Sequence, residues 1–457
     1  MTTDAAQEQR AEQTRRLFLE THPSRLFFKA ALPGAASMLA SALYNLADGI
    51  FVGQLLGQQA FAAINLAMPF VILNFAFGDM IGVGSAVPIS IGLGKGDAAK
   101  ANNIFSCSVL LNLVLGAITG LVLYLAAPSI FALMGATGEL AEMATTFLRV
   151  YAVASPLTVG MFAVDNYFKV CGHIRSSLVL NVGMSVFGGV VEFSLMYFFH
   201  LGVFGAALGY ALAMAVCFLA GLLPFALGRM QLRFVRPQVS WVIVREIAGA
   251  GMPVFLSNAA GRVTSIAINS ALLFFGGEYA VSVFGLVMYV DDFVFPLLYG
   301  VCDSLQPSIG YNWGAGRFDR VIAIEKRCVV AAAVISISSA VAVYMAPDQL
   351  TALFISNPPA ELLEMARLAF RVFSLVFLVR WVSSTTQLFL IAVQRSKLAT
   401  ILALLSSFIL PLAEIPLLWP LGLLGLWLNF PVMAVIVGVV SLVLLRLFRE
   451  ELHLSGK

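Results

Sequence analysis

Charged residues are scarce in this sequence, and their scarcity excludes a soluble globular protein. Asp, Glu, Lys and Arg make up 11% of the 457 residues, whereas hydrophobic residues make up 60% and the mean hydropathy is +0.94. Soluble domains average about 25% charged and about 45–50% apolar residues. The composition therefore predicts an all-α membrane protein that crosses a lipid bilayer many times and has no soluble domain.

Residues that build metal centres and catalytic sites are also few. The chain has four histidines and five cysteines, and the cysteines have no metal-ligand spacing. It has no Walker lysine motif, no His-Glu-x-x-His motif and no Gly-x-Ser-x-Gly elbow. We therefore expect no enzyme activity, no certain metal site, no cofactor and no nucleic-acid partner. Because no nucleotide-binding domain is encoded, any transport must draw its energy from an ion gradient.

The apolar residues are grouped in segments long enough to cross a membrane. A bilayer core of about 30 Å requires about 20 apolar residues in a helix. Twelve segments meet this requirement, and they predict twelve transmembrane helices, at residues 30–54, 60–92, 101–126, 139–168, 176–199, 203–228, 244–275, 281–312, 322–345, 361–393, 398–419 and 423–447.

Basic residues alternate with acidic residues in the segments between these spans. One set of ends carries most of the Lys and Arg, for example Arg16, Lys95, Lys169, Arg236, Arg317, Lys397 and Arg449. The opposite ends carry Glu139, Glu142, Glu278, Asp348, Glu361 and Glu364. By the positive-inside rule, both termini are expected to be cytoplasmic in a bacterial inner membrane.

The second half of the chain repeats the first at an offset of about 220 residues. Leu32-Pro33 recurs as Met252-Pro253, and Gly94-Lys95-Gly96 recurs as Gly314-Ala315-Gly316. Parallel repeats of six helices are a common construction of secondary transporters, which bind substrate between the halves. The predicted parts are an N-terminal tail (1–29), an N-lobe (30–228), a linker (229–243), a C-lobe (244–447) and a C-terminal tail (448–457).

Three motifs resemble signatures of the multidrug and toxic compound extrusion (MATE) transporters. Tyr44-Asn45-Leu46-Ala47-Asp48-Gly49 resembles their first-helix motif, and Gln306-Pro307-Ser308-Ile309-Gly310-Tyr311-Asn312 resembles the end of their eighth helix. Gly425-Leu426-Trp427-Leu428-Asn429-Phe430-Pro431 resembles the start of their last helix. The sequence is most similar to the prokaryotic DinF-like branch.

This resemblance implies a V-shaped transporter with two lobes. It also implies export of small organic, often cationic or amphipathic compounds in exchange for H⁺ or Na⁺. The family's first-helix aspartate and the proline of its helix bend match Asp48 and Pro33. In the fifth helix, Gly188 stands at the family's asparagine, Glu192 at its aspartate and Phe193 at its proline. The carboxylate is therefore kept while one oxygen ligand of a Na⁺ site is lost.

Asp48 and Glu192 are expected to lie at similar depth in the N-lobe. A charge at mid-membrane costs roughly 2.5–3.5 kcal/mol even on lenient scales. At 1.5 Å per residue, the two carboxylates lie about 27 and 24 Å along their helices. Two close carboxylates cannot both ionise cheaply, so a proton or a cation should be taken up between them. Tyr44 and Asn45 are neighbouring candidates, and the alternative is that all these groups only hydrogen-bond locally.

The C-half contains its own set of intramembrane charges: Arg262, Asp291, Asp292, Arg380 and Glu414, the last being the repeat counterpart of Glu192. Opposite charges at this depth suggest ion pairs, because a lone buried charge is costlier. One alternative is that these pairs are a static salt-bridge network that holds the C-half together. The other is that an Arg–carboxylate pair breaks when substrate or cation binds, and that its members line the substrate cavity. Asp79 and Asp165 are expected to be structural.

Aromatic and methionine side chains facing a central cleft would bind varied amphipathic molecules. Tyr289 and Met161 are candidates. Two further functions remain open, namely a flippase or exporter of lipid-linked or anionic metabolites on a related fold, and a passive channel. We expect a monomeric antiporter of drug-like molecules.

Overall fold

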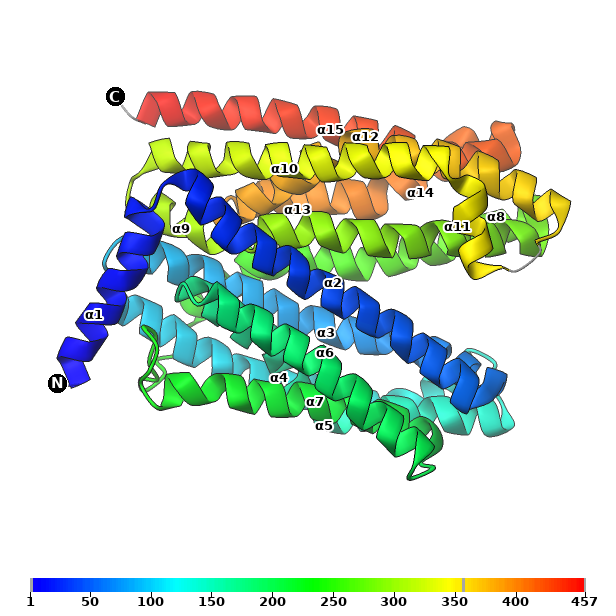
Figure 1. Cartoon of the computed structure of the whole chain (residues 1–457), viewed down its shortest axis with the longest axis horizontal. Coiled ribbons are helices and arrows are strands. Elements are labelled where there is room, and N and C mark those ends of the chain that lie inside the picture. Colours follow the sequence, from blue (N-terminus) through cyan, green and yellow to red (C-terminus); the bar gives the residue numbers. More distant parts are fainter. Residues whose placement is uncertain (1–2, 356–357, 456–457) are drawn as a thin grey trace.

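The molecule consists of two helical bundles that diverge from one end (Figure 1). The computed structural model describes residues 3–355 and 358–455, and this part of the chain contains helices and no strands. The bundles form a V that is open at the end opposite the two termini. The predicted all-α, V-shaped architecture is confirmed.

The N-lobe comprises six long helices. They are α2 (Pro23–Leu55), α3 (Gly57–Gly94), α4 (Ala98–Leu133), α5 (Gly138–Val170), α6 (Ile174–Tyr197) and α7 (Gly202–Ala226). Side-chain caps begin some of these helices, as at Asp97, whose carboxylate accepts a hydrogen bond of 2.9 Å from the backbone N–H of Lys100.

The C-lobe contains more breaks. It comprises α8 (Trp241–Asp303), α9 (Gln306–Gly314), α10 (Phe318–Met345), α11 (Pro347–Phe354), α12 (Ala360–Ala392), α13 (Ser396–Leu404), a π-helical turn (Leu405–Ile409), α14 (Leu410–Leu418), a 3₁₀ turn (Trp419–Leu421) and α15 (Gly422–Ser455). The end of the predicted C-terminal tail, residues 456–457, lies outside the described residues.

Twelve membrane passes follow from these elements. Within α8, Gly277 has φ 61° and ψ −155°, a conformation in which the chain reverses and which only glycine adopts readily. The helix therefore supplies one pass on each side of Gly277. Gly422 (φ 58°) separates α14 from α15 in the same way. Nine helical stretches of the described residues are long and apolar enough to span, and dividing two of them and adding α12 gives twelve.

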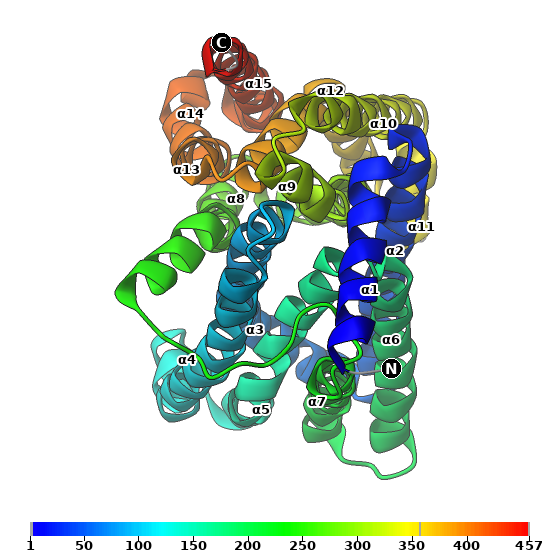
Figure 2. The ribbon, with the colours of Figure 1, turned by 90° about the vertical axis from the view of Figure 1, so that its left-hand side faces the viewer.

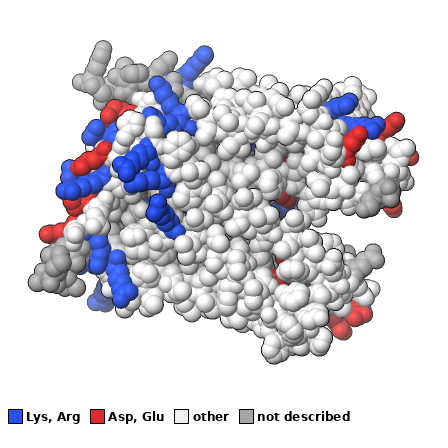
Figure 3. Space-filling view, in the orientation of Figure 1, with Lys and Arg blue, Asp and Glu red and all other residues white. Residues whose placement is uncertain are grey.

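Apolar side chains cover the sides of the bundles, and charges gather at the two ends. On α4, Ile118, Leu121 and Leu125 are each more than half exposed, which is expected of a surface that faces lipid rather than water. Figure 3 shows many Lys and Arg, with some Asp and Glu among them, at the end with the termini, and Asp and Glu at the tips of both bundles, with Lys or Arg beside them on the upper one. The sides between these ends are nearly free of charge in this view.

The lobes are packed together at the end that carries the termini. Helices α2 and α3 of the N-lobe pack against α8 and α9 of the C-lobe (Figure 2). Two repeat-related glycines allow α3 and α9 to approach closely. A Cβ atom on Gly94 would lie 2.1 Å from the carbonyl oxygen of Tyr311, and one on Gly314 would lie 2.2 Å from that of Ile91. Backbone thus contacts backbone where the V closes.

Replacing Gly94 by alanine is expected to weaken this closure. The new methyl group overlaps Tyr311 O, and overpacking of this kind typically costs about 1–3 kcal/mol. The measurement is thermal unfolding of the purified protein. Gly285→Ala is the control, because nothing lies within 4 Å of that Cβ and alanine favours a helix. Equal unfolding temperatures for the two variants would contradict the role given to the α3–α9 contact.

The N-terminal segment is helical and contacts both lobes. Helix α1 (Thr3–Arg15) and a π-helical turn (Arg16–Glu20) precede α2. The hydroxyl of Thr14 donates to the carbonyl of Cys171 in the N-lobe (3.2 Å). Phe18 is fully buried, and its carbonyl accepts hydrogen bonds from Asn312 and Arg320 of the C-lobe (3.0 and 2.9 Å). The residues predicted as a tail therefore bridge the closed end of the V.

Candidate functional site

The N-lobe brings the side chains of Glu192, Tyr44 and Asp48 together. Glu192 on α6 is completely buried. Its Oε2 accepts a hydrogen bond of 2.5 Å from the Tyr44 hydroxyl on α2. Its Oε1 is buried and has no hydrogen-bond partner of good geometry among the described residues. Asp48 lies one helical turn beyond Tyr44 and is half-buried. Its carboxyl group interacts electrostatically with that of Glu192.

Tyrosines enclose this carboxylate pair. The ring of Tyr44 stacks on Tyr210 of α7, with 4.5 Å between the ring centroids. Tyr151 of α5 and Tyr210 both lie close enough to Asp48 and Glu192 to interact with them electrostatically. Four helices therefore supply the site. Asn45, the chain neighbour of Tyr44, is exposed.

Replacing Tyr44 by phenylalanine tests the hydrogen bond to Glu192. The ring can still stack on Tyr210, but the buried carboxyl loses its donor, and a lost hydrogen bond to a buried charged group typically costs about 1–3 kcal/mol. We expect a lower free energy of unfolding in chemical denaturation. Tyr210→Phe is the control, since its hydroxyl forms no hydrogen bond in the described structure. A similar loss in both variants would argue against a specific contribution of this bond.

A cavity of about 500 Å³ lies mainly within the C-lobe. This volume falls in the usual range of about 300–1,000 Å³ for small-molecule sites. Its wall is mostly apolar and includes Phe284, Phe295, Phe430, Met288 and Met433, with polar groups from Ser257, Asn258 and Gln387. Met38 and Asp79 of the N-lobe complete it. The cavity therefore lies where the two lobes meet.

An ion pair between Arg380 of α12 and Asp291 of α8 is part of the cavity wall. Both side chains are largely buried, with exposed fractions of 17% and 18%. The guanidinium of Arg380 also lies within 6 Å of the ring centroids of Phe295, Phe373 and Phe377. Its charge is thus held between one carboxylate and three aromatic faces.

The other three predicted C-lobe charges, those of Arg262, Asp292 and Glu414, do not take part in this ion pair. Arg262 and Asp292 are exposed and interact with each other electrostatically, with no salt bridge between them. Glu414 is 4% exposed, and both its carboxyl oxygens are buried without a hydrogen-bond partner of good geometry among the described residues. It is close to the backbone of Met433. Glu414 is therefore beside the cavity and not part of the lining.

The structure places Tyr289 and Met161 away from the cavity. Tyr289 is 55% exposed and stacks on Phe354, whereas its neighbour Met288 lines the cavity. Met161 is 2% exposed in the N-lobe core. One residue of shift turns a helical side chain by about 100°, which explains the difference between positions 288 and 289. Pro33 lies inside α2, which continues as a helix on both sides of it.

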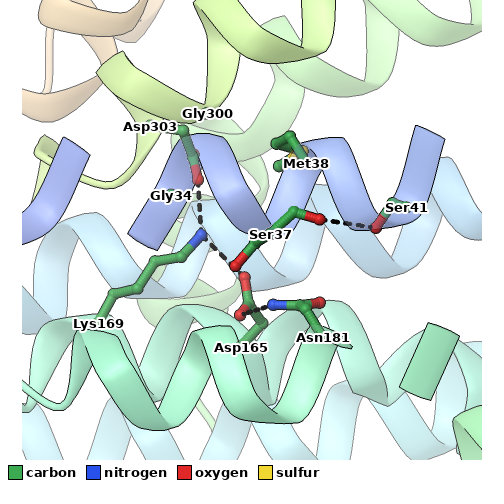
Figure 4. A pocket seen from close by; sticks show the side chains of 9 residues that line it. All are labelled: Gly34, Ser37, Met38, Ser41, Asp165, Lys169, Asn181, Gly300 and Asp303. Atoms are coloured by element: carbon green, nitrogen blue, oxygen red, sulfur yellow. Dashed lines mark hydrogen bonds and ion pairs between the residues drawn. The ribbon is translucent and has the colours of Figure 1, made fainter. Parts of the chain in front are cut away.

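A buried lysine is the feature that the sequence did not indicate. Lys169 was expected in a loop, but α5 continues to Val170 and the Lys169 side chain is only 5% exposed. Its Nζ contacts Asp165 Oδ2 at 2.8 Å and Asp303 Oδ2 at 2.7 Å. Asp165 also accepts hydrogen bonds from Ser177 and Asn181 of α6. Asp165 is therefore part of an ion cluster at the interface of the lobes (Figure 4).

The N-lobe and C-lobe sites have different chemical capacities. The Asp48–Glu192 pair can exchange a proton or hold a small cation, because carboxyl and phenol oxygens are its polar groups. No group of three or more His, Cys, Asp or Glu side chains suited to a metal ion occurs in the described ranges. The cavity can hold an organic molecule through apolar and aromatic contacts.

Comparison with known proteins gives one family over most of the chain. The MatE family profile matches residues 33–194 and 253–415, one segment in each lobe. The multidrug export protein MepA of Staphylococcus saprophyticus is 26% identical over 430 residues, which cover 92% of this chain and 93% of that protein.

Solved structures with the same fold include two described as MATE transporters. One, described as MATE in complex with MaL6, has a TM-score of 0.90 at 22% identity and covers 96% of this chain and 99% of that chain. The other is described as the outward-facing conformation of a multidrug resistance MATE family transporter. Its TM-score is 0.90 at 22% identity, with coverage of 95% and 98%.

Proposed function

Because the chain belongs to the MatE family of transporters, we propose that it exports small organic, often cationic or amphipathic compounds by antiport with H⁺ or Na⁺. The coupling ion is taken up at Asp48 and Glu192. The observation that carries this proposal is the buried carboxyl of Glu192, which interacts with the Asp48 carboxyl and has one oxygen without a hydrogen-bond partner of good geometry among the described residues.

Ion uptake changes the energetics of the N-lobe. When a proton or Na⁺ binds, the two carboxylates no longer repel each other in a medium of low dielectric constant. The packing of α2 against α6 then favours a different arrangement. Substrate and ion need not touch, because each need only favour a different state of the lobes.

The cavity of about 500 Å³ is the proposed substrate site. Its aromatic and methionine side chains can repack around molecules of different shape, which suits a multidrug exporter. The positive charge of Arg380 is neutralised by Asp291. This neutralisation disfavours an anionic or lipid-linked cargo, which would be bound best by unpaired cations.

The charge distribution supports a cytoplasmic location of both termini. The end with the termini carries most Lys and Arg, and this bias sets the orientation of membrane proteins. The V then opens to the outside of a bacterial inner membrane. In this orientation a substrate in the cavity leaves by the open end.

Transport by the purified protein in liposomes tests the proposal directly. Ethidium movement is measured under an imposed pH gradient, an imposed Na⁺ gradient or neither, at equal membrane potential. Antiport requires accumulation against the ethidium gradient under one of the two ion gradients, and that gradient names the ion. Equal movement under all three conditions would instead identify a passive channel.

A further inference from the structure

A groove of about 420 Å³ lies between the beginnings of α2 and α6, at the end of the molecule that carries the termini. Its lining contains no Asp or Glu and consists of three cations and three apolar residues: Arg25 and Lys29 of α2, Arg175 of α6, and Phe28, Leu32 and Pro33 of α2. Figure 3 shows Lys and Arg side chains on this face where the two helices begin. The groove shares no lining residue with the cavity of about 500 Å³.

The three cations of the groove are not neutralised by the protein. Arg25, Lys29 and Arg175 are exposed, and their side chains form no salt bridge or hydrogen bond within residues 3–355 and 358–455. The two arginines lie in the first turns of α2 and α6. A cation is disfavoured there, because the positive end of the helix dipole lies at the N-terminus. An anion held in the groove would compensate these charges.

The apolar part of the groove continues from the charged part along α2. Residues 25, 28, 29 and 32 have the spacing of one helical face. Phe28 and Leu32 are 60% and 65% exposed, so this face is turned outward from the bundle. Arg25 and Leu32 are about 10 Å apart along the helix axis. This length corresponds to the step from the headgroups to the acyl chains of a lipid, a boundary of about 5–10 Å.

The C-lobe does not repeat this cluster of cations. At the repeat offset of 220 residues, Gly249 stands at the position of Lys29, and Arg395 stands at that of Arg175. The guanidinium of Arg395 lies over the ring of Phe448, 5.6 Å from its centroid. The general excess of Lys and Arg at this end is common to both lobes, and it does not account for a groove found in one of them.

We propose that this groove binds one anionic phospholipid from the surrounding membrane. The phosphate lies among the three cations, and an acyl chain follows Phe28 and Leu32. Basic pockets between helices on the cytoplasmic side of a membrane suit anionic headgroups in this way. The bound lipid joins α2 to α6, the two helices that also carry the carboxyl groups of the candidate ion site. This inference goes beyond the proposed function and does not depend on export.

The test is native mass spectrometry of the full-length protein in detergent. The protein is titrated with phosphatidylglycerol, with phosphatidylcholine of the same acyl chains, or with inorganic phosphate, and the dissociation constant of the first bound ligand is determined. Each cation near an anionic lipid contributes about fivefold in affinity. We therefore expect phosphatidylglycerol to bind at least about tenfold more tightly than phosphatidylcholine. Inorganic phosphate is expected to bind more weakly than phosphatidylglycerol, because it makes no contact with the apolar part of the groove.

Two triple variants locate the binding site. Removing the three cations by Arg25→Gln, Lys29→Gln and Arg175→Gln is expected to weaken phosphatidylglycerol binding by at least about tenfold. The matched control removes three other exposed cations from the same end of the molecule, by Lys95→Gln, Arg233→Gln and Arg236→Gln. We expect it to bind phosphatidylglycerol as the wild type does. If the first triple variant does not fold, Lys29→Gln alone is expected to weaken binding by about fivefold.

Three results would overturn the inference. Equal weakening in the two triple variants would show attraction to the general charge of this end. Equal affinity for phosphatidylglycerol and phosphatidylcholine would show that the headgroup charge is not recognised. Inorganic phosphate that binds as tightly as phosphatidylglycerol would identify a site for a free anion in place of a lipid.

Discussion

Replacing Asp48 by asparagine is expected to abolish ion-coupled export while the protein remains folded in the membrane. Asparagine has nearly the same shape, but it cannot take up a proton and brings no charge to a cation. The Glu192 carboxyl keeps its hydrogen bond from Tyr44 and no longer faces a second carboxyl group. Coupling then fails because the ion no longer distinguishes the two states of the N-lobe.

The measurement is ethidium export by the purified variant in liposomes, under the ion gradient that drives export by the wild type. We expect the gradient-dependent rate to fall by at least about tenfold. Glu142→Gln is the matched control, since it removes an exposed carboxylate at the open end of the same lobe. Undiminished export by Asp48→Asn would rule out the coupling role.

Combining Asp48→Asn with Glu192→Gln gives a second view of the same site. If the two carboxylates act as one ion site, the double variant should be no slower than either single variant. Residues that act as a unit are strongly non-additive in this way. If the losses in export rate of the two single variants simply add in the double variant, the two carboxylates contribute independently. The proposal of one shared ion site would then be wrong.

Breaking the ion pair in the cavity wall is expected to have the second-largest effect. Arg380→Ala leaves Asp291 as an unpaired, largely buried carboxylate. Loss of one partner of a fully buried pair costs about 3–5 kcal/mol, and an exposed pair is worth at most about 1 kcal/mol. The 17% and 18% exposed fractions place this pair between these limits, nearer to the buried one. A clear decrease in unfolding temperature is expected.

A charge-neutral double variant separates the pair from the packing of Arg380. Asp291→Asn combined with Arg380→Gln removes both charges, and we expect it to be more stable than Arg380→Ala. Arg367→Ala is the control. Arg367 forms two hydrogen bonds with Asp348 at the exposed end of the lobe (2.6 and 2.8 Å), and they lower the pKa of that carboxyl. Its loss is expected to change the unfolding temperature little. Equal decreases for Arg367→Ala and Arg380→Ala would contradict the importance given to burial.

Part of the candidate site could be predicted from the sequence, because depth in a membrane follows from position along a helix. The predicted similar depth of Asp48 and Glu192 agrees with the electrostatic interaction between them in the structure. The tyrosines around them could not be predicted in the same way. Tyr151 and Tyr210 are on α5 and α7, and only the packing of four helices brings them to the carboxylates.

The cavity shows the limit of sequence reasoning more clearly. The sequence indicated Tyr289, but Met288 faces the cavity, because the rotation of each helix about its axis depends on its neighbours. Lys169 is a second example. A two-residue difference in the end of α5 moves it from an expected loop to a buried cluster with Asp303. Hydropathy alone does not define a helix end to that precision.

The sequence by itself determined the class of protein, the twelve spans, the repeat and the acidic residue at membrane depth. These features depend on bilayer thickness, on charge and on spacing along one chain, and each of them can be read in one dimension. Only the tertiary structure decided that Tyr44 donates to Glu192, that Arg380 pairs with Asp291 in the cavity wall, and that Lys169 joins the lobes. Those contacts depend on how helices far apart in the sequence are rotated and packed, and a lipid-facing surface constrains that packing only weakly.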